Sequence, residues 1–132
     1  MSGETNLEKL LASMSPVLND GEYVFCSFEH ARYGDLSEMQ PIAAFSESEG
    51  LTLVIPRSIA DSNAFSYESV FKSITLKVHS SLEAVGLTAA FSSKLTEHNI
   101  SANVIAGYYH DHIFVPAEDA ERALAALEEL SR

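Results

Sequence analysis

The alternation of apolar and polar positions along the chain predicts several short strands. The clearest is SITLKVH, residues 73–79, where Ile74, Leu76 and Val78 alternate with polar residues. Strict alternation of this kind is typical of a strand with one buried face. Further strands are predicted at residues 22–31, 41–47, 51–57, 101–109 and 112–116. The segments PIAAFSE and LTLVIPR are predicted to pair as a hairpin, because the turn residues SESEG connect them.

Apolar residues spaced three to four apart predict three amphipathic helices. The first lies at residues 5–14 and ends before Pro16, the second begins at Gly86 and ends near residues 97–99, and the third covers residues 117–130. One or two further helical turns are predicted within residues 57–65. From residue 73 onward the predicted order is therefore strand, helix, strand, strand, helix.

The two halves of the chain resemble each other when they are offset by 60 residues. Residues 53–56, LVIP, then align with residues 113–116, IFVP. In each copy a strand ends in an apolar residue and a proline and leads into a helix, and proline suits the first helical turn. We interpret this as a duplicated unit whose first copy lacks a clear helix between its opening strands. Two such units predict two antiparallel sheets backed by helices.

Composition and charge narrow the class of protein. The chain has 132 residues, of which 46% are apolar, enough for a hydrophobic core in one compact domain or two small ones. Its 8 basic and 19 acidic residues give a net charge of −11, so neither nucleic acid nor a membrane is expected as a partner. No apolar run is long enough for a membrane span and no secretory signal is visible, so a cytoplasmic location is expected. The single cysteine, Cys26, lies in a predicted strand, where a buried structural thiol is expected.

Three segments of the second half carry a resemblance to a known family. They are the strand ITLKV, the loop-to-helix passage EAVGLTAAFSSKLTEHNISANVIAG and the hairpin YYHDHIFVPAEDAERAL. Together they resemble an ACT domain, the small regulatory ligand-binding module of amino-acid metabolism, in a layout similar to the C-terminal regulatory domains of aspartate kinases. The whole chain also resembles small free-standing bacterial proteins built from two ACT-like units.

The resemblance implies an α+β fold of two ferredoxin-like units of the βαββαβ type, with antiparallel sheets and helices on one face. The expected domains are an N-terminal ACT-like unit at residues 1–70 and a C-terminal ACT domain at residues 71–132. The expected activity is regulatory binding of a small molecule, most simply an amino acid. No catalysis and no cofactor are implied.

Gly86 lies at the predicted start of the second helix, although glycine is a poor helix former. The free amides and the positive end of the macrodipole favour an anion there, and glycine lets a ligand carboxylate approach closely. In ACT domains a glycine lies between the first strand and the first helix, and amino-acid ligands bind beside it at an interface between two domains. The resemblance therefore implies a ligand site formed by Glu83, Ala84, Val85, Gly86, Leu87, Thr88, Asn103, Val104 and Ile105.

The same residues have a purely structural interpretation, in which Gly86 permits close packing and Thr88 and Asn103 satisfy local backbone groups. Two functions therefore remain open: binding a small molecule, or acting as an interaction and dimerisation module without a ligand. A packing interface would not need Glu83, Thr88 and Asn103 to converge, and this favours the first function. A homodimer is also expected, because the apolar segment VIAGYY at residues 104–109 would otherwise leave an exposed edge.

Two chemical alternatives have weaker support. The sequence HDH at residues 110–112 puts two imidazoles on one face of an extended strand, a spacing that metal sites can use. No cysteine or further carboxylate accompanies them at ligand spacing, so a hairpin tip is the preferred interpretation and no metal is predicted. The sequence HSS at residues 79–81 supplies a base and hydroxyls, but no glycine elbow, phosphate loop or zinc-helix motif is present, so an enzyme is only a minor alternative.

Overall fold

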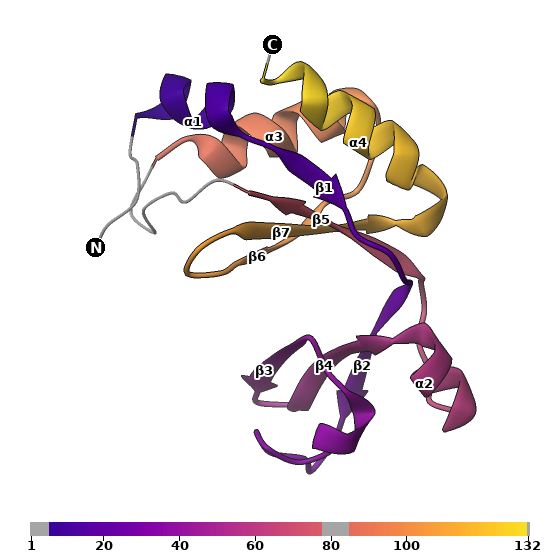
Figure 1. Ribbon diagram of the computed structural model, residues 1–132. Coiled ribbons are helices and arrows are strands. Elements are labelled where there is room, and N and C mark those ends of the chain that lie inside the picture. The colour runs from indigo at the N-terminus through magenta and orange to yellow at the C-terminus, as the bar shows by residue number, and fades with distance from the viewer. Residues whose placement is uncertain (1–5, 78–84, 132) are drawn as a thin grey trace. The chain divides into compact units, whose positions relative to one another are not determined.

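The computed structural model describes residues 6–77 and 85–131, which fold into two compact units (Figure 1). One unit is discontinuous in sequence and combines Met1–Asp20 with Lys72–Arg132. The other is Gly21–Phe71, and we call it the inserted unit because it interrupts the first along the chain. Each unit is an antiparallel sheet with helices and has its own hydrophobic core.

The sheet of the discontinuous unit contains β1 (Pro16–Leu18), β5 (Phe71–Leu76), β7 (Asp111–Pro116) and β6 (Asn103–Ala106), side by side in that order. β1 runs antiparallel to β5, with Leu18 opposite Ile74, and β6 runs antiparallel to β7, with Val104 opposite Ile113. Within this unit, β1 therefore lies at one edge of the sheet and β6 lies at the other.

Helices α1 (Leu7–Ser13), α3 (Leu87–Glu97) and α4 (Ala120–Glu129) cover one face of this sheet. Figure 1 shows all three on the same side of β5 and β7. Ile74 and Leu76 are fully buried against the helices, as the alternation at 73–79 predicts, but Ser73 and Thr75 on the other face are buried as well, so the prediction of a single buried face is wrong for residues 73–76. Val78 lies outside the described residues. The core is built from Leu10, Met14, Ile74, Leu76, Leu87, Phe91, Leu95, Ile100, Ile113, Val115, Ala120, Ala123, Ala126 and Leu127.

Residues 6–20 lie with the second half of the chain. Strand β1 pairs with β5, and Leu10 and Met14 of the first helical segment are buried in the core formed by α3 and α4. The compact units differ in these residues from the expected ranges 1–70 and 71–132, which stay a prediction. A three-residue strand that begins at Pro16 is too short to carry a periodic signal, so no local pattern indicates β1.

The inserted unit contains β2 (Tyr23–Phe28), the 3-10 turn η1 (Ser37–Met39), β3 (Ala43–Glu47), β4 (Gly50–Pro56) and α2 (Arg57–Ser62). Its strands lie in the order β3-β4-β2, and β4 is antiparallel to both neighbours. Val24, Cys26, Leu51, Leu53, Ile55 and Ala60 form its core. Cys26 is buried there, as predicted, and its thiol contacts the carbonyl of Ser66.

The segment between β2 and β3 forms no α-helix, in agreement with the sequence. His30, Leu36 and Gln40 all adopt positive φ angles of 67°, 63° and 56°, and such left-handed residues interrupt a right-handed helix. Leu36 and Met39 from this segment are partly buried and pack against the core of the inserted unit. The unit therefore keeps a ferredoxin-like sheet with one α-helix.

The internal repeat is visible in the backbone. Pro56 ends β4 and precedes α2, and Pro116 ends β7 and precedes the 3-10 turn η2 (Ala117–Asp119). Their φ and ψ angles are −57° and 135° for Pro56, and −53° and 136° for Pro116. Both prolines stand immediately before the first helical residue, one position earlier than predicted. The fixed φ of proline suits this extended position equally well.

Candidate functional site

The start of α3 explains the glycine at position 86. Gly86 is the residue before the helix, with φ of 100°, a left-handed conformation that side chains rarely adopt. Its carbonyl accepts the first helical hydrogen bond, from the amide of Ala90 at 2.9 Å. The sequence placed Gly86 within the first turn, whereas the structure places it just before that turn, where it redirects the chain.

The space beside Gly86 is filled by α1. A Cβ atom at position 86 would lie 3.1 Å from Cδ2 of Leu7, closer than an ordinary van der Waals contact. A side chain at this position would therefore be strained in its backbone and would also press on Leu7. This contact supports the packing interpretation of Gly86.

The other predicted residues around the helix start are placed as follows. Glu83 and Ala84 lie outside the described residues. Val85 is 84% exposed, Thr88 is exposed on the first turn of α3, and the side chain of Leu87 is buried in the core. A ligand at this region could therefore contact the backbone of residues 85–88 and the side chains of Val85 and Thr88.

The predicted residues on β6 divide between the two faces of the sheet. Val104 packs on the helix-covered core, whereas Asn103 and Ile105 point to the opposite face. The amide of Asn103 donates to the carbonyl of Phe114 on β7 at 3.4 Å. Within residues 6–77 and 85–131, no hydrogen bond joins Asn103 to the start of α3.

A polar network on the sheet face opposite the helices was not predicted. Asn19 Nδ2 donates to Ser73 Oγ at 3.0 Å and to Thr75 Oγ1 at 2.9 Å, and Thr75 Oγ1 lies 3.1 Å from His112 Nδ1. Ser73 and Thr75 are buried. The signal in the sequence was present, because these residues are the polar positions of the alternating strand.

His112 belongs to this network, and His110 and Asp111 precede it in the chain. Burial lowers the pKa of His112, with a smaller contribution from His110, and Asp111 acts in the opposite direction. Burial raises the pKa of Asp111, and the two histidines oppose that rise. His110 Nδ1 is buried without a hydrogen-bond partner. In the part of the chain that the structure describes, no group of three histidine, cysteine, aspartate or glutamate side chains is placed to hold a metal ion.

An open depression of about 980 Å³ lies on the surface of the inserted unit, and its charged and hydroxyl lining residues are exposed. It is formed by Ser27 at the end of β2, the following residues 29–32, and the turn between β3 and β4 at residues 47–50. Its lining combines Arg32 with three glutamates and two serines. None of these residues belongs to the predicted site.

Comparison with known proteins gives a match along almost the entire chain. The family model of the ACT domain matches residues 2–72, and a second ACT-domain model matches residues 68–129. A crystal structure of a Vibrio cholerae protein of unknown function, described as a possible transport protein, is 56% identical, covers 96% of each chain and has a TM-score of 0.87. No curated protein matches the chain.

Two aspartate kinase structures share the fold at low identity. The regulatory subunit of the Thermus thermophilus enzyme, in its ligand-free form, is 10% identical, with 91% of this chain and 99% of that chain covered and a TM-score of 0.62. Aspartokinase III of E. coli in complex with aspartate and ADP is 13% identical, with 88% of this chain and 33% of that chain covered and a TM-score of 0.65. In the described ranges, no helix has the length and apolar character needed to cross a bilayer.

Proposed function

The chain belongs to the ACT-domain family, and we propose that it is a regulatory protein that binds an amino acid and catalyses no reaction. The observation that carries this proposal is that two ACT units account for almost all of the chain. The matched segments run from residue 2 to residue 129 and leave no room within these residues for a separate catalytic domain. We also propose a cytoplasmic location.

We propose the start of α3 as the ligand site, formed by residues 83–88 together with residues 103–105 of β6. The amides of a helix's first turn have no partner within the helix, and the macrodipole is positive there. Gly86 adds no side chain, and Val85 and Thr88 are exposed. A ligand carboxylate can accept hydrogen bonds from these amides, which contribute about 1.5–3 kcal/mol when one partner is charged.

We propose that a second copy of the chain supplies Asn103 to this site. Its side chain is exposed, and its hydrogen bond to Phe114 is long at 3.4 Å. An amide can donate to a carboxylate or accept from an ammonium group, so it suits either end of an amino acid. We therefore propose a homodimer in which a second copy completes the site.

The second candidate function is an interaction and dimerisation module without a ligand. The contact between Gly86 and Leu7 favours it, because close packing of α1 on α3 would by itself require a glycine. Exposed Tyr108 and Tyr109 at the tip of the β6–β7 hairpin offer an apolar contact surface.

A thermal-shift screen against the twenty amino acids separates the two functions, since a ligand that binds only the folded state raises the melting temperature. The hit is then titrated by calorimetry into Gly86→Ala and Asn103→Ala variants. Gly34→Ala is the matched control, because Gly34 has a similar φ of 97° but nothing within 4 Å of its Cβ position. We expect weaker binding in the first two variants and unchanged binding in the control. A screen without hits would favour the interaction module.

A further inference from the structure

We draw no further inference here: the strongest candidate, the edge strand β3 of the inserted unit with the exposed side chains of Ile42 and Phe45, carries none because nothing in the described part of the chain shows what covers it.

Discussion

Thr75 and His112 are joined across the sheet of the discontinuous unit, with Thr75 Oγ1 at 3.1 Å from His112 Nδ1. The same hydroxyl accepts from Asn19 Nδ2 at 2.9 Å, and it can donate to Nδ1 of a neutral imidazole or accept from an Nδ1–H group. One threonine thereby links β5, β7 and the residue that follows β1.

Replacing Thr75 by valine should lower the stability of the protein. The change keeps the shape of the side chain but leaves the Asn19 amide and His112 Nδ1 without their shared partner on a buried face, at a cost of about 1–3 kcal/mol. Urea unfolding followed by circular dichroism measures this loss. Thr88→Val is the control, because Thr88 is exposed and should change stability by less than about 0.5 kcal/mol. Equal stabilities of the two variants would contradict a role for the network.

The pH dependence of stability should contain a contribution from His112. Burial lowers its pKa in the folded state below the ordinary value of 6.5, so the unfolded chain binds the proton more tightly. The stability that neutral His112 contributes is complete above pH 6.5 and is lost as the pH falls from 6.5 through the lower folded-state pKa. The raised pKa of Asp111 acts in the opposite sense, because the stability that protonated Asp111 contributes is lost as the pH rises from 3.8 through its folded-state pKa.

Unfolding measurements between pH 5 and pH 8 on the natural chain and on His112→Asn check this sign. We expect the natural chain to lose more stability than the variant on going from pH 8 to pH 5. His98→Asn serves as control, because His98 lies at the end of α3, away from the network. Identical pH profiles for the natural chain and His112→Asn would show that His112 is not titrating in this window.

The Leu10→Ala substitution tests whether the N-terminal segment that contains α1 folds with the discontinuous unit. Leu10 is fully buried in the core shared by α3 and α4, and truncating a buried leucine costs about 2–5 kcal/mol. Hydrogen exchange should therefore accelerate in α4, at residues 123–127, more than in the inserted unit. Leu11→Ala, at a half-buried neighbouring position, should have a smaller effect. If protection is lost in residues 21–71 instead, the division at residues 70 and 71 expected from the sequence is the correct one.

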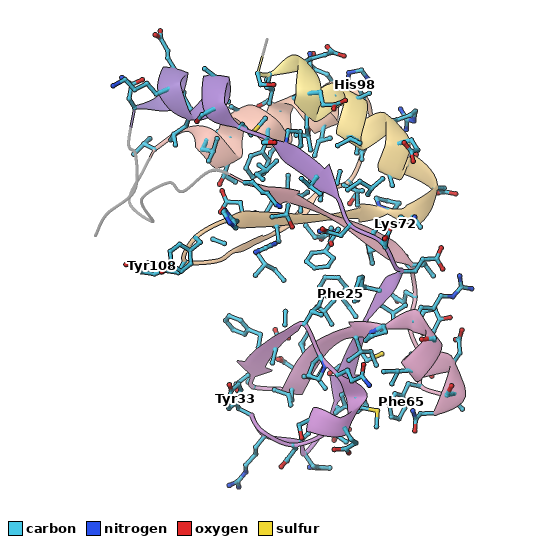
Figure 2. The ribbon with its side chains drawn as sticks, viewed as in Figure 1. Phe25, Tyr33, Phe65, Lys72, His98 and Tyr108 are labelled. Carbon is cyan, nitrogen blue, oxygen red and sulfur yellow. The ribbon has the colours of Figure 1, made fainter. Side chains whose placement is uncertain are left out.

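Light scattering should report a homodimer, and the tip of the β6–β7 hairpin is the surface to test. Figure 2 shows Tyr108 pointing outward from this hairpin, and Tyr108 and Tyr109 are 60% and 64% exposed. We expect the double substitution of these tyrosines by serine to raise the dimer dissociation constant about tenfold or more, because aromatic residues dominate interface energies. Tyr33→Ser, at an 81% exposed tyrosine of the inserted unit, should leave it unchanged. A monomer at all concentrations would contradict the dimer itself.

The local patterns in the sequence were sufficient to predict which face of β5 packs against the helices. Ile74 and Leu76 alternate with polar residues, and this period of two places them on the helix side wherever the strand lies in the sheet. The repeat of LVIP and IFVP likewise predicted that β4 and β7 end alike, because each proline restricts the backbone of its own residue. The sequence also determined the charge of −11 and, through its resemblance, the ACT fold.

Tertiary structure alone decided which distant segments meet. Strand β1 is only three residues long, and its place beside β5 depends on hydrogen bonds to a strand more than fifty residues away, which no local period encodes. The contact of Leu7 with Gly86, the Asn19–Thr75–His112 network and the open depression beside Arg32 have the same origin. Each of these features joins residues from separate elements. No local pattern in the sequence indicates which residues will be in contact. The sequence therefore determined the elements and their buried faces, whereas the pairing of elements determined the candidate sites.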